Sequence, residues 1–291
     1  HRTDILNTPA NFTLVSGLTA MSPDNIGIID NEGFEFEAGY DNRIGDFRYY
    51  IKGNAGYAHN TIIENGEADQ PYDYMYSKGH SIGQYTGYHH IGFFQSYEEI
   101  AASPTQFGLT NLMPGDSKYA DINGDGVVNE NDQTIIGFNV VPEITYAVDL
   151  GASWKGIDLS VMFQGATRSS VQLYGDLGYD NMWGCYYEEH KNRWTPETAA
   201  TATYPRLNRQ SLENTNNYYV SDFWTYDSSY LRLKNVQLGY TLPKKVGDAI
   251  HLSKARVYFT GENLLTIDKV KAAIDPEIAV RTANGASDQR N

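Results

Sequence analysis

The fold is decided by the stretch Gly33–Tyr57, GFEFEAGYDNRIGDFRYYIKGNAGY. From Phe34 to Tyr40 every second residue is apolar or aromatic, and the residues between them are glutamate or glycine. The same alternation resumes at Phe47 after a short polar turn. A period of two places the apolar side chains of a β-strand on one face. The stretch therefore predicts an antiparallel hairpin with one apolar and one polar face.

Two further pairs of strands are predicted from the same pattern. Residues 145–154 and 157–164 alternate on either side of the turn Lys155-Gly156. Residues 230–242 and 255–265 form the third pair. A strand that crosses a bilayer at a tilt needs about 9–11 residues, which is close to the length of these runs.

The connections between the predicted strands are very unequal in length. Within a pair they run from about 2 to 12 residues, whereas long loops at about 59–143 and 167–228 separate the pairs. Compact soluble domains rarely contain structureless loops of that length. Outer-membrane barrels combine short periplasmic turns with long external loops. The asymmetry favours an all-β fold in which the strands form a segment of a transmembrane antiparallel β-barrel with long extracellular loops.

Aromatic residues beside the short turns support the same prediction. Such barrels carry aromatic girdles at the membrane interfaces, and Tyr40, Phe47, Trp154 and Tyr240 occupy that level. Lipid-facing apolar stripes are expected at Phe34/Phe36, Val148/Leu150, Leu159/Val161 and Val236/Leu238. The alternative is a soluble, secreted glycan-binding β-domain with a calcium loop, which would bury these stripes in a sandwich core.

Composition excludes several classes of protein. The 291 residues carry a formal net charge of −14, which argues against nucleic-acid binding through a general basic surface. The single cysteine, Cys185, excludes an internal disulfide framework and a cysteine-rich zinc site. The hydrophobic share of 41% is too high for a disordered chain. The chain opens at His1 without methionine and stops in a polar stretch, so we expect a fragment of a longer protein.

One local motif predicts a metal site. The stretch Asp121–Asp132, DINGDGVVNEND, fits the twelve-residue calcium loop of EF-hand and dockerin proteins. Its expected ligands are Asp121, Asn123, Asp125, the Val127 carbonyl, Asn129 and Asp132, with the turn-making Gly126 at position 6. Calcium prefers six to eight oxygens, and this spacing wraps them around one point. We expect a structural Ca²⁺; the alternative is a solvated turn of Asp, Asn and Gly.

Aromatic residues crowd both long loops. Flat rings with a polar tip suit sugar faces or peptide side chains. The candidate substrate-binding residues are Tyr85, Tyr88, Tyr179, Trp183, Tyr186 and Tyr187. The alternative for each ring is a place in a small core under its own loop.

The sequence predicts no catalytic residue. The pairs Glu98-Glu99 and Glu188-Glu189 could suggest a glycosidase, but charged loop faces explain them better. His80, His89 and His90 make a poor chelate for a transition metal. A nucleophile elbow, a phosphate-binding glycine loop and an HExxH motif are all missing from the sequence. We therefore expect a binding or transport protein and not an enzyme.

An ordered set of motifs resembles the C-terminal half of SusC/RagA-like TonB-linked (TonB-dependent) outer-membrane transporters. The resemblance extends over all 291 residues, and its strength lies in the order of the motifs. The matching stretches are Arg2–Leu6, Asn25–Gly27, Asn31–Glu35, Gly87–Gln95, Glu98–Ile100, Gly115-Asp116, Tyr119–Gly126 with Asp132, Ile136-Gly137, Asp158–Ser160, Phe163–Gly165, Trp194–Pro196, Pro205-Arg206, Ser229–Asn235, Leu238–Pro243, Gly261–Thr266 and Asp275–Glu277.

The resemblance implies a barrel of about 22 strands, normally plugged, in the bacterial outer membrane. Residues 1–291 would be a C-terminal part of that barrel, without the plug domain and the closing strands. The family imports glycans or oligopeptides, with a SusD-like surface lipoprotein as a lid. Energy comes from the TonB complex through the plug region. The implied partners are thus the lipoprotein, the rest of the transporter, the TonB complex, the substrate and outer-membrane lipid.

Overall fold

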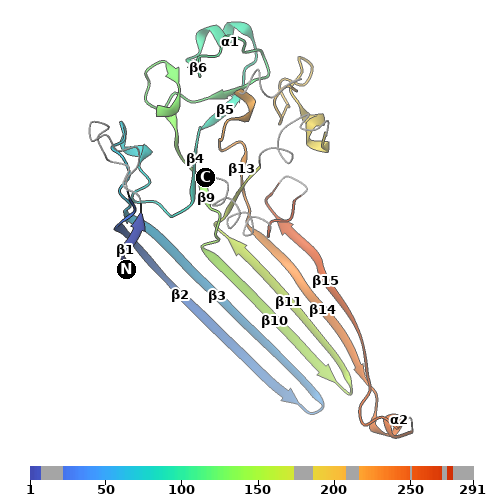
Figure 1. Ribbon diagram of the computed structural model, residues 1–291. Helices are drawn as coiled ribbons and strands as arrows, with labels where there is room; N and C mark the ends of the chain where they lie inside the picture. Colours follow the sequence, from blue (N-terminus) through green and yellow to red (C-terminus); the bar gives the residue numbers. More distant parts are fainter. Residues whose placement is uncertain (8–21, 174–185, 208–215, 250, 271–273, 278–291) are drawn as a thin grey trace.

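The computed structural model describes residues 1–7, 22–173, 186–207, 216–249, 251–270 and 274–277 (Figure 1). Its main feature is a seven-stranded antiparallel sheet in the order β1-β2-β3-β10-β11-β14-β15. These strands are β1 (Arg2–Asn7), β2 (Asp24–Ile44), β3 (Phe47–Glu64), β10 (Ile144–Trp154), β11 (Ile157–Thr167), β14 (Tyr230–Thr241) and β15 (Arg256–Asp268).

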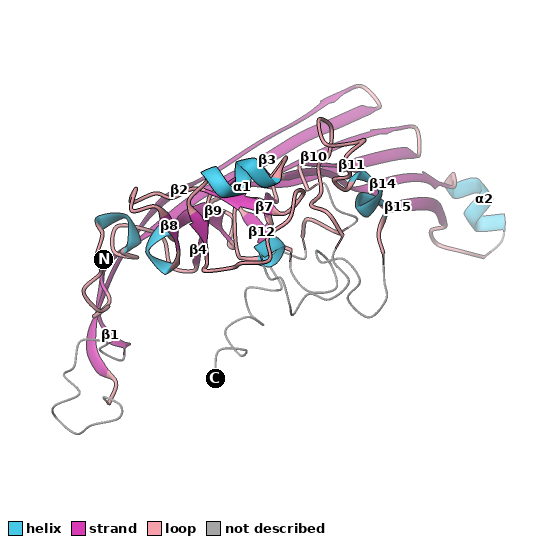
Figure 2. Cartoon of the chain, turned by 90° about the horizontal axis from the view of Figure 1, so that it is seen from above, coloured by secondary structure: helices cyan, strands magenta, loops and turns pink. Residues whose placement is uncertain are grey.

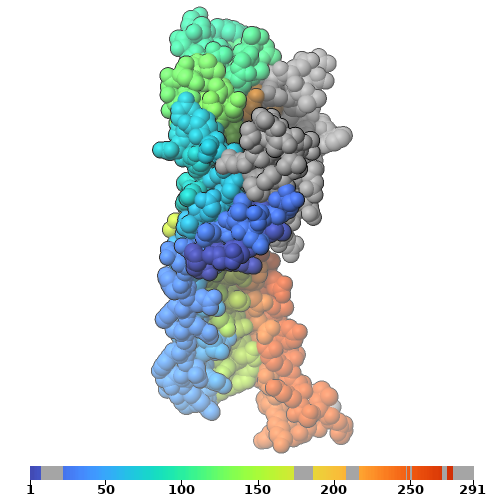
Figure 3. All heavy atoms as spheres, turned by 60° about the vertical axis from the view of Figure 1, so that its left-hand side comes forward, coloured from blue at the N-terminus to red at the C-terminus, as the bar shows by residue number. Residues whose placement is uncertain are grey.

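The long connections fold at one end of the sheet, where they carry short strands and single helical turns (Figures 1 and 3). In the first connection these are η2 (Asp73–Met75), β4 (Gln84–Gly87), β5 (His90–Phe93), α1 (Tyr97–Ala102), β6 (Thr105–Gln106), β7 (Ser117–Tyr119), β8 (Val127–Val128), η3 (Glu130–Asp132) and β9 (Thr134–Asn139). In the second they are β12 (Ser170–Gln172), η6 (Glu188–Asn192), η7 (Asn216–Tyr218) and β13 (Thr225–Asp227). At the opposite end of the sheet, α2 (Lys244–Ala249) lies in the β14–β15 connection. None of the described helices is long and apolar enough to span a membrane.

The three predicted hairpins are confirmed. Two strands are longer than the alternation predicted, since β2 begins at Asp24 and β3 continues to Glu64. Both extensions lie at the loop end of the sheet, where residues of mixed polarity show no regular period of two. The edge strand β1 was not predicted, because RTDILN is too short and irregular to show a period of two.

The register of the sheet aligns apolar residues on one face and polar residues on the other. One cross-strand row consists of Tyr40, Ile51, Leu150, Val161 and Val236. The neighbouring row, on the opposite face, consists of Asp41, Tyr50, Gly151, Ser160 and Gln237. Since side chains alternate between the faces of a sheet, the first face is apolar over its whole width and the second is polar.

The apolar face is open in this structure. Phe34 is 65% exposed, Phe36 is 61% exposed and Leu238 is 51% exposed. Figure 2 shows the long strands as a single layer, with no second sheet against them. The sandwich alternative is therefore wrong for the described residues, because it required these stripes to be buried. The buried aromatic residues gather instead in the folded loops, where Phe94, Tyr119 and Trp224 are at most 2% exposed.

The turns at the far end of the sheet are tight. Lys155 and Gly156 link β10 to β11 with φ angles of +48° and +91°. Positive φ at both central residues is typical of the type I′ turn, whose twist matches that of the flanking strands. Gly45 begins the β2–β3 turn with φ +63°. Because these two links are short, the long connections after β3 and β11 lie at the other end of the sheet, whereas the β14–β15 connection with α2 lies at this end.

Candidate functional site

The two long loops form one folded unit above the sheet, and a buried polar network holds them together. Asp116 is fully buried, and its Oδ1 lies 2.6 Å from Nε of Arg206 in the second loop. Asn217 donates its side-chain amide to Asp116 Oδ1 at 3.2 Å, and its Oδ1 accepts the backbone N–H of Ser117 at 2.7 Å. Buried polar groups that satisfy one another in this way fix the relative position of the elements that carry them.

Four rings drawn from both loops form the core of this unit: Tyr88, Phe107, Tyr119 and Tyr219. Phe107 stacks on Tyr219 with 3.8 Å between ring centroids. Tyr88 is only 5% exposed, and its hydroxyl accepts a hydrogen bond from the Gln133 amide at 2.9 Å. The prediction that Tyr88 contacts substrate is thus corrected, because its ring packs inside the loops and is closed to a ligand.

The other predicted aromatic residues fall into three groups. Tyr85 is half-buried on β4. Tyr179 and Trp183 lie outside the described residues. Tyr186 and Tyr187 are 57% and 39% exposed and line a surface pocket of about 300 Å³. This volume is at the lower limit of small-ligand sites, at about 300–1,000 Å³.

The pocket combines aromatic and charged groups. Its lining consists of Tyr186, Tyr187, Glu188, His190, Lys191, Arg193 and Leu207. His190 is buried beneath the two tyrosines, and its Nδ1 accepts the backbone N–H of Tyr187 at 3.0 Å. Lys191 is paired with Glu188 at 2.7 Å. The Arg193 side chain is exposed and is not paired to a carboxylate among the described residues. The pocket therefore offers two phenol rings for apolar contact and one cation, Arg193, for a polar contact.

The predicted calcium loop adopts the wrapped backbone that its spacing implies. The carboxylate of Asp121 accepts backbone N–H groups of Gly124, Asp125 and Gly126 at 2.7, 3.2 and 2.8 Å. Asn123 and Asp125 form the next two such turns, since Asn123 Oδ1 accepts the N–H of Asp125 and Asp125 Oδ1 accepts that of Val127. Gly124 and Gly126 have φ of +75° and +86°, a conformation in which glycine carries no steric cost.

The last two predicted ligands close the loop. Asn129 caps η3 through a hydrogen bond from the N–H of Asn131. Asp132 is fully buried, and its two oxygens accept the N–H groups of Ile122 and Asn129 at 2.7 and 2.8 Å. Among the described residues, no group of three His, Cys, Asp or Glu side chains is arranged to hold a metal ion. A carboxylate has about four lone-pair sites, so these hydrogen bonds leave some oxygen lone pairs that could still bind a cation. The calcium ion remains a prediction.

Two tyrosines that the sequence did not single out for this loop pack against it. Tyr72 and Tyr74 stack with 5.3 Å between ring centroids. The Tyr74 hydroxyl donates to the carbonyl of Asn131 at 2.5 Å, and the Asn123 amide donates to the Tyr72 hydroxyl at 3.2 Å. Burial raises the pKa of Tyr74, and the negative charges of Asp132, Asp121 and Asp125 raise it further. The three acidic side chains therefore lie near the phenol of Tyr74. The alternating tyrosines of residues 71–76, PYDYMY, did not predict this proximity.

The histidines and glutamate pairs take structural places. The His89 ring is hydrogen-bonded through Nδ1 to the carboxylate of Asp222, and this contact joins the two loops. His90 lies among the rings of Phe93, Tyr119 and Phe223. Burial lowers the pKa of His90 to about 4, so its imidazole is neutral at pH 7.

The glutamate pairs are likewise engaged with neighbouring groups. Glu99 pairs with Lys118 at 2.8 Å and accepts the backbone N–H of Gln95. Glu188 pairs with Lys191. In each pair the two glutamates are adjacent in one helical turn, so they do not face each other across a cleft as the two carboxylates of a glycosidase do.

Comparison with known proteins gives a consistent relationship along the whole chain. No family model matches the sequence. TonB-dependent receptor P3 of Formosa agariphila is 27% identical over 303 residues, covering 100% of this chain and 29% of that protein. Receptor P26 of the same organism is 30% identical over 269 residues, covering 87% of this chain and 26% of that protein. TonB-dependent receptor SusC of Bacteroides thetaiotaomicron is 23% identical over 95% of this chain and 27% of its own length.

Solved structures share the fold. The match to the structure of the RagAB peptide transporter covers 94% of this chain and 29% of the transporter chain, with a TM-score of 0.66 and 23% sequence identity. The RagAB importer in its open-open state gives a TM-score of 0.67 at 21% identity. The chain thus spans less than a third of each of these relatives. Along its whole length this chain is therefore similar in sequence to TonB-dependent receptors, SusC among them, and its sheet shares the fold of a segment of the RagAB transporter structures.

Proposed function

We propose that this chain forms part of the wall of an outer-membrane importer that works with TonB. The observation that carries the proposal is the sheet itself, whose apolar face is exposed and continuous in register across six strands, from β2 to β15. An exposed apolar face of this width needs a hydrocarbon environment. The polar face would line the interior of the barrel, and the folded loops would form the external vestibule.

The proposed substrates are glycans or oligopeptides. One of the related structures is a peptide transporter, which supports the second class. The pocket at Tyr186 and Tyr187 suits either class, because phenol rings pack on sugar faces and on peptide side chains. A SusD-like lipoprotein would close over the loops, and the TonB complex would act through a plug region in the same transporter.

Uptake by cells that carry the full-length receptor tests this function. Fluorescent oligopeptides and oligosaccharides of matched size would be supplied in the presence and absence of a functional TonB complex. We expect one class to accumulate only when both the receptor and TonB are present. Accumulation of neither class, or uptake that is independent of TonB, would contradict the proposal.

The role of the pocket is tested by a double variant, Tyr186→Ala with Tyr187→Ala, in the same cells. Each lost ring contact is expected to weaken binding by about 1 kcal/mol, so that uptake falls roughly tenfold or more at low substrate concentration. Tyr97→Ala is the matched control, because Tyr97 is 59% exposed on α1 and lies outside the pocket. Equal uptake by the double variant and the control would place the substrate contacts elsewhere.

We further propose that Asp121, Asn123, Asp125, the Val127 carbonyl, Asn129 and Asp132 hold a structural calcium ion. The supporting observations are the wrapped loop and the closeness of three carboxylates to Tyr74. The ion would brace the first long loop at the largely exposed segment 121–127.

A further inference from the structure

The pocket at Tyr186 and Tyr187 contains a cation, Arg193, that the loops around it leave unpaired. The structure describes five other lysines and arginines in the two long loops, and each of them pairs with a carboxylate. The pairs are Lys78 with Glu64, Lys118 with Glu99, Arg168 with Glu143, Lys191 with Glu188 and Arg206 with Asp116. Arg193 is exposed and has no such partner among the described residues, although acidic residues outnumber basic ones by 36 to 22 in this chain. Its charge is therefore available to a ligand.

The backbone of Arg193 is held in place from several sides. Its carbonyl accepts the Thr198 hydroxyl at 2.8 Å, and a β-bridge pairs Arg193 with Tyr204. The next residue, Trp194, is 9% exposed and donates its ring N–H to the side chain of Gln95 at 3.2 Å. The exposed guanidinium thus extends from a fixed point, which lowers the entropic cost of holding a ligand there.

The two phenol rings of the pocket are supported by His190. The His190 ring meets both rings edge-on, with its centroid 5.9 Å from that of Tyr186 and 5.8 Å from that of Tyr187. Its Nδ1 also accepts the backbone N–H of Tyr187, which fixes the start of this helical turn. The pocket therefore combines a supported apolar wall with one unpaired cation, and the complementary ligand has an apolar group next to a negative charge.

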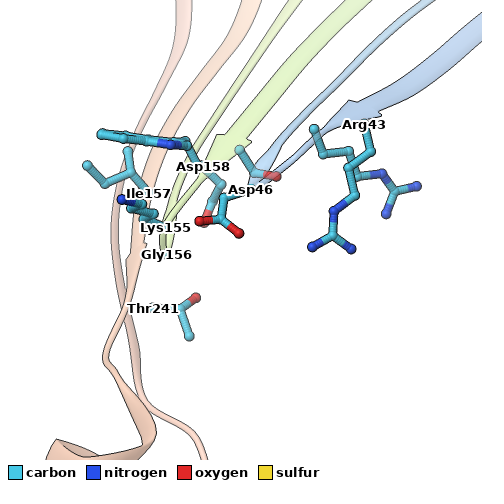
Figure 4. A pocket seen from close by; sticks show the side chains of 10 residues that line it. Arg43, Asp46, Lys155, Gly156, Ile157, Asp158 and Thr241 are labelled. Atoms are coloured by element: carbon cyan, nitrogen blue, oxygen red, sulfur yellow. The ribbon is translucent and has the colours of Figure 1, made fainter.

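A pocket of similar volume, about 310 Å³, lies beside the tight turns at the other end of the sheet and lacks this arrangement (Figure 4). Its lining includes the cations of Arg43, Arg48 and Lys155 and also the carboxylates of Asp46 and Asp158. Figure 4 shows Arg43 on the opposite side of the pocket from Lys155 and Asp158. The charges of this pocket are mixed and separated, so they favour neither an anionic nor a cationic ligand.

We propose that Arg193 makes the pocket at Tyr186 and Tyr187 selective for a ligand with one carboxylate beside an apolar group. The planar guanidinium donates two parallel hydrogen bonds to the two carboxylate oxygens, while the phenol rings contact the apolar group. Among the proposed substrates, this chemistry belongs to the C-terminal residue of an oligopeptide and to a uronate sugar of an oligosaccharide. A polyanion is a poor ligand, because the pocket offers one unpaired cation and the chain has a net charge of −14. The inference rests on the proposed function as an importer.

The test measures binding of matched ligands to the purified full-length receptor by isothermal titration calorimetry. The first pair is an oligopeptide that ends in leucine with a free C-terminal carboxylate, and the same oligopeptide with a C-terminal amide. The second pair is an oligosaccharide that contains a uronate, and its carboxyl-reduced neutral form. Because a hydrogen-bonded charge strengthens binding by about tenfold or more, we expect wild type to prefer the charged member of one pair about tenfold. The pair that shows this preference identifies the source of the carboxylate.

Variants of one side chain show whether Arg193 causes the preference. In Arg193→Gln the preference should disappear, and the neutral ligand should bind as it does to wild type, which also shows that the variant is folded. Arg193→Lys should retain part of the preference, because lysine keeps the charge but not the planar donor fork. The control is Lys78→Gln, which removes the cation of an exposed pair outside the pocket and should keep the full preference.

The outcomes separate this inference from the proposed function. Equal binding of the charged and neutral members of both pairs by wild type would overturn the inference and leave the importer standing. An unchanged preference in Arg193→Gln, or an equal loss in Lys78→Gln, would also overturn it, because the charge of Arg193 would then have no special role. If wild type binds no member of either pair and cells that carry the receptor take up neither class of ligand, both the inference and the proposed function fail.

Discussion

Arg206 and the fully buried Asp116 join the two long loops through an ion pair of 2.6 Å between Nε and Oδ1. The residues are far apart in the sequence, and each lies in a different connection of the barrel wall. The two folded loops are therefore one body, and a change at either residue should affect both loops.

Replacement of Arg206 by alanine should loosen the loops. The variant leaves a buried carboxylate without its cation, which typically costs about 3–5 kcal/mol. We expect a value near the lower limit, about 3 kcal/mol, because the N–H of Met113 and the Asn217 amide still donate to Asp116. Hydrogen exchange in the full-length receptor should show faster exchange in both loops. Lys191→Ala, which removes an exposed ion pair with Glu188, should leave local stability almost unchanged.

Replacement of Val148 by arginine tests which face of the sheet meets lipid. Val148 lies in the apolar row between Gly53 and Phe163. An arginine on the lipid face near the middle of the bilayer costs about 2–4 kcal/mol. We expect that loss in the free energy of unfolding of the receptor in bilayers. Thr145→Arg, an exposed position on the opposite face, is the control and should cost much less. A variant at Val148 as stable as wild type would reverse the assignment of the faces.

The alternation of Phe34 to Tyr40 and its repeats predicted the hairpins, the apolar face and the end of the sheet where the loops lie. A place in a small loop core was the alternative for each ring, but the partners of Tyr88 could not be predicted, because Phe107 and Tyr219 come from distant parts of two loops. The same holds for Tyr72 and Tyr74 on the acidic loop. Local spacing determines the turns of Asp121 and Asp125, whereas contacts between loops depend on tertiary packing that has no period in the sequence.

Replacement of Gly151 by alanine should strain the polar face of the sheet. The ring of Tyr50, its cross-strand partner, covers Gly151 so closely that an added Cβ would approach a ring carbon to 2.1 Å. The ring must swing away, and overpacking of this kind typically costs about 1–3 kcal/mol. The free energy of unfolding of the full receptor measures the loss. With Tyr50→Ser in the background, Gly151→Ala should cost little, and an equal loss in both backgrounds would show that the ring is not the cause.

The loops should become less stable as the pH decreases, because the buried His90 binds a proton less readily than it does in the unfolded chain. Its pKa is lowered by burial to about 4, from an ordinary value of 6.5, while Asp222 opposes the shift and His89 adds to it. Between those values the unfolded state binds the proton and the folded state does not, so stability is lost as pH decreases from about 6.5 to 4. The slope is about 1.4 kcal/mol per pH unit. The Tm difference between wild type and His90→Phe should therefore change over this range and stay constant above pH 7; a constant difference throughout would show that His90 does not titrate there.

Calcium should stabilise the first loop. A ligand that binds only the folded state at 100 times its Kd adds about 2.7 kcal/mol, so a chelator should lower the Tm of the purified receptor and added Ca²⁺ should restore it. Mg²⁺ should restore it less, because it demands near-ideal octahedral geometry at shorter distances than Ca²⁺ does. In Asp121→Ala with Asp125→Ala, the response to Ca²⁺ should disappear. Asp132 is left intact because it also accepts the N–H of Asn129 in the capping box of η3. Its loss would unfold this turn whether or not a metal ion is bound. If the chelator leaves the Tm of the wild type unchanged, the hydrogen bonds of Asp121, Asn123 and Asp125 hold the loop by themselves, and the motif is a metal-free series of turns.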